Sequence, residues 1–90
     1  MKTARKNCSS NHRGYLDIIA DILEASRRKI RKTQLMYRCN LSYKQVKAYL
    51  SLMLEKRLLR YADGDSSAFK ITDKGERFLE AYKSLLGLIG

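Results

Sequence analysis

Histidine and cysteine are scarce in this 90-residue chain, and it contains neither proline nor tryptophan. Cys8, Cys39 and His12 are too few to complete a four-ligand zinc site unless carboxylates or a second subunit contribute. The sequence also contains no glycine-rich phosphate loop and no Ser/His/Asp set that would assemble a catalytic site. We therefore expect a protein that is not an enzyme, with no catalytic residues, no cofactor and no metal.

Long apolar runs are absent as well. None approaches the ~20 residues that a membrane-spanning helix needs, and the basic N-terminus lacks the apolar stretch of a secretory signal. We expect a cytoplasmic protein with no membrane partner. In that setting a disulfide between Cys8 and Cys39 is disfavoured, and Cys39 is expected to be a small buried hydrophobe.

Acidic residues are few, because nine Asp and Glu stand against nineteen Lys and Arg, which gives a formal net charge of +10 at pH 7. This imbalance favours a polyanionic partner, nucleic acid before an anionic membrane surface. The alternative is a generic basic surface that only keeps the protein soluble. The 44% apolar fraction is normal for a folded protein, and the length suits a single domain.

The stretch from residue 33 to residue 60 holds the most informative pattern. A short helix over 33–39, a polar turn over 40–42 and a longer helix over 43–56 predict a helix-turn-helix. One face of the longer helix is apolar, which turns its polar side chains at least partly away from the core. The apolar positions are Val46, Leu50, Met53 and Leu54. A helix of this kind suits the major groove of DNA.

The boundary between these two helices carries its own signals. Ser42 and Gln45 have the S-x-x-Q spacing of a capping box, in which each side chain satisfies a backbone N–H of the other residue. Asn40 suits the left-handed conformation that commonly ends a helix. The longer helix is therefore predicted to begin directly after Ser42.

The flanking segments complete a fold. A first helix is predicted from about Gly14 to Arg28, and alternating residues over 58–62 and 68–72 predict two strands joined by the loop 63–67. The apolar side of the first helix comprises Leu16, Ile19, Ile22 and Leu23, widened by Ile18 and Ala20. Three helices followed by a β-hairpin make a winged helix.

The last helix is predicted to be capped by Thr72 and to run to about Leu88. It carries an apolar seam with coiled-coil spacing, for which we expect a role as dimer interface. The seam residues are Phe78, Tyr82, Leu85, Leu86 and Ile89. The expected fold class is mostly α with a small β-hairpin, a winged helix-turn-helix plus a C-terminal dimerisation helix.

The chain is accordingly divided into three parts. Residues 1–13 are expected to form a flexible basic arm, residues 14–72 the winged helix-turn-helix domain, and residues 73–90 the C-terminal helix.

Candidate DNA contacts come from three places in the sequence. Before the helix-turn-helix, residues 27–32 carry five positive charges, and this basic segment is interpreted as a phosphate-binding element, with a solvated loop as the alternative. Near the start of the longer helix, Lys44 and Lys47 lie three residues apart and are expected to project together. The full set is Arg28, Lys29, Arg31, Lys32, Ser42, Tyr43, Lys44, Gln45, Lys47, Arg60 and Lys70.

Some of these side chains have an equally plausible structural role. Gln45 is expected to serve its capping box, and Tyr43 either packs at the turn or donates to a phosphate. Tyr37 and Tyr49 are interpreted as packing residues. The hairpin loop carries Asp63 and Asp65 and no base, so repulsion from DNA phosphates is expected there.

Over residues 15–80 the chain resembles the small archaeal winged-helix DNA-binding proteins. The resemblance rests on a KT-x-[IL]-MY-x-x-NLSY core and a later T-x-KG step, which match at Lys32, Thr33, Leu35, Met36, Tyr37, Asn40, Leu41, Ser42, Tyr43, Thr72, Lys74 and Gly75. It implies a basic, chromatin-associated or transcription-regulating protein that dimerises by antiparallel pairing of its last helices. Relatives often extend that helix into a long rod, whereas the sequence here stops at Gly90.

The leading functional hypothesis is a double-stranded DNA-binding homodimer, either a transcription regulator or a nucleoid-associated protein. The alternative is a winged-helix protein-interaction module within a larger assembly, which the acidic wing and the short apolar C-terminal helix favour. Double-stranded RNA binding is a third and weaker hypothesis.

Overall fold

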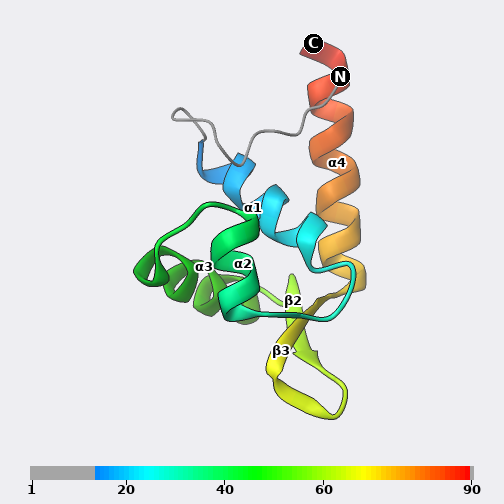
Figure 1. The fold of residues 1–90 in the computed structure, drawn as a ribbon. Coiled ribbons are helices and arrows are strands. Elements are labelled where there is room, and N and C mark those ends of the chain that lie inside the picture. The colour runs from blue at the N-terminus through cyan, green and yellow to red at the C-terminus, as the bar shows by residue number, and fades with distance from the viewer. Residues whose placement is uncertain (1–13, 90) are drawn as a thin grey trace.

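The computed structural model describes residues 14–89, which form four helices and a three-stranded antiparallel sheet (Figure 1). The elements in chain order are α1 (Tyr15–Ala25), β1 (Ile30–Arg31), α2 (Lys32–Arg38), α3 (Tyr43–Glu55), β2 (Leu59–Ala62), β3 (Asp65–Ile71) and α4 (Asp73–Ile89). The predicted winged-helix architecture is confirmed. In Figure 1 the β2–β3 hairpin and the far end of α4 lie at opposite ends of the molecule.

The core lies where the first three helices meet the sheet and the first half of α4. Ile22, Leu23, Leu35, Val46 and Met53 are completely buried there. They come from α1, α2 and α3 at the helical spacing that the sequence predicts. Removing a side chain of this kind typically costs about 2–5 kcal/mol of stability, because the cavity collapses only partly. This core fixes α3 relative to the sheet.

Two helices end in the same way, with a left-handed residue after the last turn. Asn40 has φ 53° and Arg57 has φ 64°. After each, an N–H reaches back to a carbonyl of the last turn: Leu41 donates to Met36 and Leu58 to Met53, both at 2.9 Å. The prediction for Asn40 is confirmed. Arg57 was not foreseen, because a left-handed arginine costs roughly 1 kcal/mol and gives no sequence signal.

The first helix ends at Ala25, three residues before the predicted end. Ser26 is completely buried, and its hydroxyl donates to the Ile22 carbonyl at 2.7 Å. Its own carbonyl accepts the N–H of Ile71 from the sheet at 2.9 Å. The chain therefore leaves α1 at Ser26 and joins the sheet, although the sequence pattern predicts that the helix continues to Arg28.

The sheet differs from the prediction in two respects. The basic segment before α2 contains a third strand, β1, which pairs with β3 through Ile30 opposite Phe69. The hairpin loop is shorter than expected, since β3 begins at Asp65 and only Asp63 and Gly64 join the strands. Gly64 adopts φ 74°, a conformation that favours glycine in such a turn.

Helix α4 begins as predicted. The Thr72 hydroxyl accepts the N–H of Gly75 at 3.0 Å and donates to the Arg57 carbonyl at 2.6 Å. The space beside Gly75 is closed, because a Cβ there would lie 2.4 Å from the Leu58 carbonyl oxygen. The first turn of α4 is therefore tied to the end of α3.

The predicted dimer seam is divided by the structure. Phe78 and Tyr82 are partly buried against the protein's own core, and the Tyr82 hydroxyl donates to Asp17 of α1. The remaining seam residues, Leu85, Leu86 and Ile89, are exposed, as is Leu88. The first half of the seam thus contributes to the core of the same chain, and the role of the whole seam as a dimer interface stays a prediction.

Four other expectations are corrected or confirmed by burial. Leu16 was placed on the apolar side of the first helix but is 50% exposed, at the second residue of α1. Tyr37 was interpreted as a packing residue but is 87% exposed. Tyr49 is partly buried and stacks on Tyr15 with ring centroids 5.9 Å apart. Cys39 is buried as expected.

None of the described helices is both long and apolar enough to cross a membrane. The predicted arm at residues 1–13, with Cys8 and His12, lies outside the described residues.

Candidate nucleic-acid interface

The start of α3 is fixed by the predicted capping box. The Ser42 hydroxyl accepts the Gln45 N–H at 3.1 Å, and the Gln45 side-chain oxygen accepts the Ser42 N–H at 2.9 Å. The box satisfies two backbone donors at the helix start and holds both side chains in place. Gln45 is thus engaged in its structural role, and its amide NH2 group is left as a donor.

Lys44 and Lys47 lie on the exposed side of the same helix. Both are exposed, whereas Val46 and Leu50 between and after them are buried. Within residues 14–89 neither lysine forms an ion pair or a side-chain hydrogen bond. The two ammonium groups are therefore available to an external anion.

Lys32 joins this surface from the start of α2. Its Nζ lies 5.1 Å from the centroid of the Tyr43 ring, a cation–π geometry. Tyr43 is 52% exposed, so the contact holds a positive charge at the surface beside the first turn of α3. Of the two roles expected for Tyr43, the structure shows packing against Lys32.

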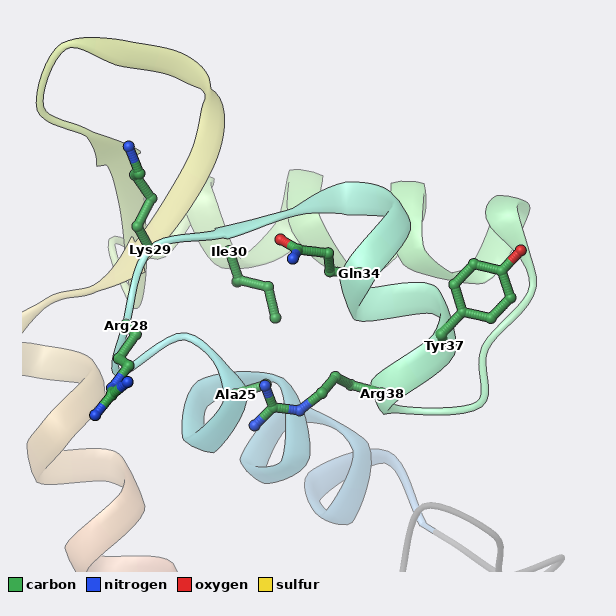
Figure 2. A pocket seen from close by; sticks show the side chains of 7 residues that line it. All are labelled: Ala25, Arg28, Lys29, Ile30, Gln34, Tyr37 and Arg38. Atoms are coloured by element: carbon green, nitrogen blue, oxygen red, sulfur yellow. The ribbon is translucent and has the colours of Figure 1, made fainter.

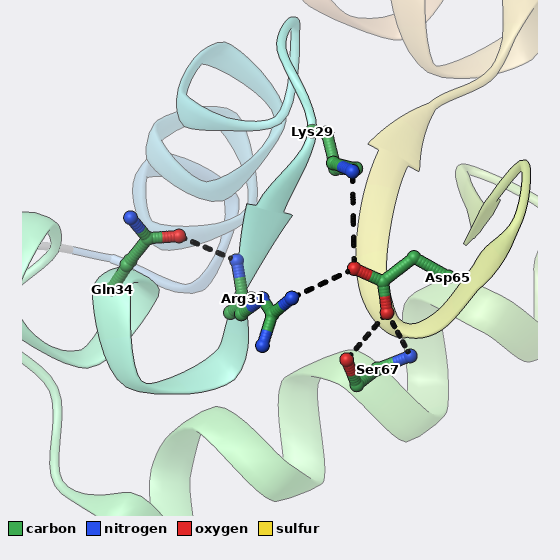
Figure 3. A network of polar contacts seen from close by, with 5 residues as sticks. All are labelled: Lys29, Arg31, Gln34, Asp65 and Ser67. Atoms are coloured by element: carbon green, nitrogen blue, oxygen red, sulfur yellow. Dashed lines mark hydrogen bonds and ion pairs between the residues drawn. The ribbon is translucent and has the colours of Figure 1, made fainter.

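The wing contains an ion-pair network that the sequence did not reveal (Figure 3). One oxygen of Asp65 lies 3.0 Å from Arg31 and 3.9 Å from Lys29, both from the β1 region. Its other oxygen accepts the Ser67 N–H at 3.0 Å and the Ser67 hydroxyl. The Arg31 N–H in turn donates to the Gln34 side chain at 2.9 Å, at the start of α2.

These contacts set the charge state of Asp65. The hydrogen bonds from Ser67, with a smaller contribution from Arg31 and Lys29, hold the pKa of Asp65 below its ordinary value, although burial opposes them. Asp65 is therefore a carboxylate at neutral pH, with much of its charge balanced by two cations. The expected repulsion between the wing and DNA is reduced accordingly.

Arg60 of β2 and Lys70 of β3 lie opposite each other, but they differ in whether a described acidic residue pairs with them. Arg60 pairs with Asp63 at 3.2 Å. Lys70 forms no ion pair with any described residue. Both line a hollow at the base of the wing together with Arg57 and Lys74. This hollow lies at the end of α3 opposite to Lys44.

The basic segment before α2 is split between two surfaces. Arg31 and Lys32 line a hollow against the wing, which also includes Thr33, Tyr61, Ser66, Ser67 and Phe69. Arg28 and Lys29 line a separate cleft, with Ala25, Ile30, Gln34, Tyr37 and Arg38 (Figure 2). The sequence did not point to the partners in the first hollow because they come from the hairpin, far along the chain, whereas among the described residues the second cleft is lined by residues 25–38 alone.

The described part of the chain contains no group of three or more His, Cys, Asp or Glu side chains that would hold a metal ion. The surface at the start of α3 presents the exposed side chains of Lys44 and Lys47, together with the partly exposed Lys32.

Comparisons with known proteins agree with the fold. A family model described as winged helix-turn-helix matches residues 12–89. An uncharacterized protein of Methanocaldococcus jannaschii is 35% identical over 78 residues, which are 86% of this chain and 36% of that protein. The chain thus spans about a third of the length of this curated relative.

A solved structure shares the fold. It is the crystal structure of Sso10a-2, a DNA-binding protein from Sulfolobus solfataricus, with a TM-score of 0.74 and 22% sequence identity. The match covers 84% of this chain and 81% of the other.

Proposed function

The chain belongs to the winged helix-turn-helix family, and we propose that it binds double-stranded DNA with the first turns of α3 in the major groove. The Sulfolobus structure of the same fold is a DNA-binding protein. This proposal assigns the same class of partner to this chain, on the strength of its own surface.

The observation that carries the proposal is the pair Lys44 and Lys47. They lie on a helix whose start is capped and whose opposite face is buried, and no described acid neutralises them. A rigid helix with uncommitted cations at its first turns has the shape and charge that a major groove accepts. Lys32, held against Tyr43, adds a third positive charge at the same end.

The other candidate residues take supporting roles in this proposal. Ser42 and the amide of Gln45 donate hydrogen bonds at the helix start, and Arg31 contacts phosphate from the wing side. Arg60 and Lys70 contact backbone phosphates only if the DNA reaches the base of the wing. Arg28 and Lys29 lie on the α1 side of α2 and contribute general attraction.

Binding of this kind has a salt signature. Neutralising about six phosphates gives a slope of log K against log salt near −5. Gel retardation over a salt series, with random and genomic duplexes, measures that slope and the specificity together. A transcription regulator prefers particular genomic fragments, whereas a nucleoid-associated protein binds both pools alike. Affinity that stays constant between low and moderate salt contradicts the proposal.

We also propose that the chain forms a homodimer through the last turns of α4. Leu88 and Ile89 are more than 80% exposed there, beside the exposed Leu85 and Leu86. An apolar cluster of this kind marks a contact surface. A second copy is the occupant we favour, because the coiled-coil spacing of the seam suits pairing with an identical helix.

Light scattering tests this interface directly. The double substitution Leu85→Glu with Leu88→Glu is expected to give a monomer with an intact winged domain, and the control Leu85→Met with Leu88→Met a dimer. A wild-type monomer at high concentration contradicts homodimerisation. It would favour the second candidate function, in which the same apolar cluster docks onto a different protein within an assembly.

A further inference from the structure

A cleft on the far side of α2 lies outside the α3 surface of the proposed DNA interface, to which two of its residues, Arg28 and Lys29, add only general attraction. It lies between the end of α1, β1 and α2, and none of its lining residues comes from α3 or from the β2–β3 hairpin. Its volume is about 540 Å³, within the range typical of small-molecule sites. The surface around it is therefore available when DNA occupies the first turns of α3.

The cleft has positive charge that is mostly not neutralised by the described residues. Arg28 and Arg38 form no ion pair or side-chain hydrogen bond with any residue in 14–89, and Lys29 has only the 3.9 Å contact with Asp65. Among residues 14–89, no acidic side chain lines the cleft. Two guanidinium groups without a carboxylate partner favour a bidentate oxyanion such as phosphate.

The rest of the lining suits a flat, partly apolar group. The floor is formed by the buried Ala25 and Ile30. Tyr37 contributes a ring that is 87% exposed and forms no ring–ring contact with another described aromatic residue. Gln34 accepts the Arg31 N–H through its oxygen, which leaves its amide NH2 as a donor.

The order of these groups along the cleft is informative. In Figure 2 the Arg38 guanidinium lies over α1 and the Arg28 guanidinium lies beside α4, Ile30 lies above and between the two, and the Tyr37 ring stands at the other end, on the far side of α2. The cleft thus offers an anion-binding end, an apolar middle and an aromatic end. A lone inorganic anion would use only the first of these.

We propose that this cleft binds a nucleoside phosphate, with the phosphate between Arg28 and Arg38 and the base against Tyr37. Exposed tyrosine rings stack on bases of any sequence, because every base presents a π face. Either a free nucleotide or an unpaired nucleotide of a nucleic-acid strand supplies this chemistry. The proposal goes beyond duplex binding and does not depend on it.

The test titrates the full chain with adenosine monophosphate, adenosine, inorganic phosphate and a single-stranded oligothymidylate, followed by NMR shifts and calorimetry. Adenosine monophosphate is expected to shift the signals of Ile30 and Tyr37 and to bind more tightly than adenosine or phosphate alone. Arg38→Ala is expected to weaken it about tenfold, the usual effect of losing a charge-assisted hydrogen bond. Tyr37→Ala weakens it and Tyr37→Phe, which keeps the ring, does not.

The matched control is Arg77→Ala, which removes an exposed arginine of α4 that also lacks a described partner. It is expected to leave nucleotide binding unchanged. Equal losses in Arg77→Ala and Arg38→Ala overturn the site, since net charge alone would explain them. Phosphate binding as tightly as the nucleotide also overturns it.

The same titrations distinguish a free nucleotide from an unpaired nucleotide of a strand as the source of the ligand. Binding of the oligothymidylate alone, lost in Arg38→Ala, supports the cleft with a strand as its source. If neither adenosine monophosphate nor the oligothymidylate binds at millimolar concentration, the proposal is overturned. A variant that loses duplex binding through Lys44 and Lys47 is expected to keep nucleotide binding, so the two functions fail independently.

Discussion

The start of α3 and the wing are both basic regions, but their cations are in different states. Lys44 and Lys47 on α3 have no acidic partner within residues 14–89. In and beside the wing, Arg31 pairs with Asp65 and Arg60 pairs with Asp63. The sequence counts these four residues equally in its net charge of +10. The structure separates charge that is available from charge that is already balanced.

This difference bears on how each region would meet DNA. A phosphate approaching Lys44 only displaces water and counterions, and counterion release drives binding. A phosphate approaching Arg31 must compete with Asp65, which two hydrogen bonds from Ser67 hold in position. Exposed ion pairs contribute little to stability, so such an exchange is possible, but it reduces the net gain. We therefore expect α3 to dominate affinity and the wing to modulate it.

The strongest test of the difference between α3 and the wing removes Lys44 and Lys47, the two lysines of α3 that have no described acidic partner. Lys44→Ala with Lys47→Ala is expected to weaken duplex binding about ten- to hundredfold, since each charged contact contributes roughly tenfold. The slope of log K against log salt should become shallower by about two. Fluorescence anisotropy over a salt series measures both. Circular dichroism should show an unchanged fold, because both side chains are exposed.

Arg27→Ala with Arg77→Ala is the charge-matched control for that variant. It also removes two positive charges, one already paired with Glu24 and Glu76 and one on α4. A loss of affinity equal to that of the lysine variant would show that only net charge matters. In that outcome α3 has no special place in the interface.

The second prediction concerns a variant in which Arg31 and Lys29 lose the negative charge of their acidic partner. Asp65→Asn keeps the size of the side chain but removes the negative charge that Arg31 and Lys29 balance. Duplex affinity is expected to rise a few-fold, with a slope steeper by about one, because freed cations displace more counterions. The same anisotropy series measures this change. Weaker binding by Asp65→Asn would show that the network orders the wing for DNA and does not restrain it.

A smaller effect is expected at the base of the wing, where Arg60 and Lys70 are opposite one another in the β2–β3 ladder. Lys70→Ala should weaken duplex binding about twofold and Arg60→Ala less, because Arg60 already shares its charge with Asp63. Equal effects would mean that the Arg60–Asp63 pair does not limit Arg60. Parallel titrations of the two single variants decide this.

The sequence predicted those features whose interactions are local. Ser42 and Gln45 are three residues apart, and Thr72 caps the Gly75 N–H three residues later, so their spacing alone indicates the helix starts. Asn40 ends α2 for a similarly local reason. Apolar periodicity located the helices and the hairpin, because burial on one face follows the backbone period.

Features that depend on distant pairing were not predictable. Strand β1 is only two residues long and exists through its pairing with β3, far along the chain. Asp65 was interpreted as a repulsive loop residue, yet its main cation, Arg31, lies 34 positions away. The exposure of Tyr37 was missed because a seven-residue helix has too few turns to define its faces. The proposed interface therefore depends on contacts that periodicity does not encode.

The state of Asp65 also predicts how the two regions respond to acid. Its pKa is lowered in the folded protein from the ordinary value of 3.8, chiefly by the Ser67 hydrogen bonds. A lowered carboxyl pKa stabilises the folded wing above the unfolded value, and this contribution is lost as the pH falls through the folded value. The wing should therefore loosen only below about pH 4, while the start of α3, which has no acid in its capping box, should not respond.

NMR provides the measurement for this last difference. The amide signal of Ser67 is expected to titrate with a midpoint below 3.8, and that of Gln45 to stay constant over the same range. The Asp65→Asn variant should abolish the Ser67 titration. A midpoint at or above 3.8 would mean that the Ser67 hydrogen bonds and the two cations do not hold Asp65 in solution. The cations of the wing would then be as available to DNA as those of α3, and the contrast between the two regions would disappear.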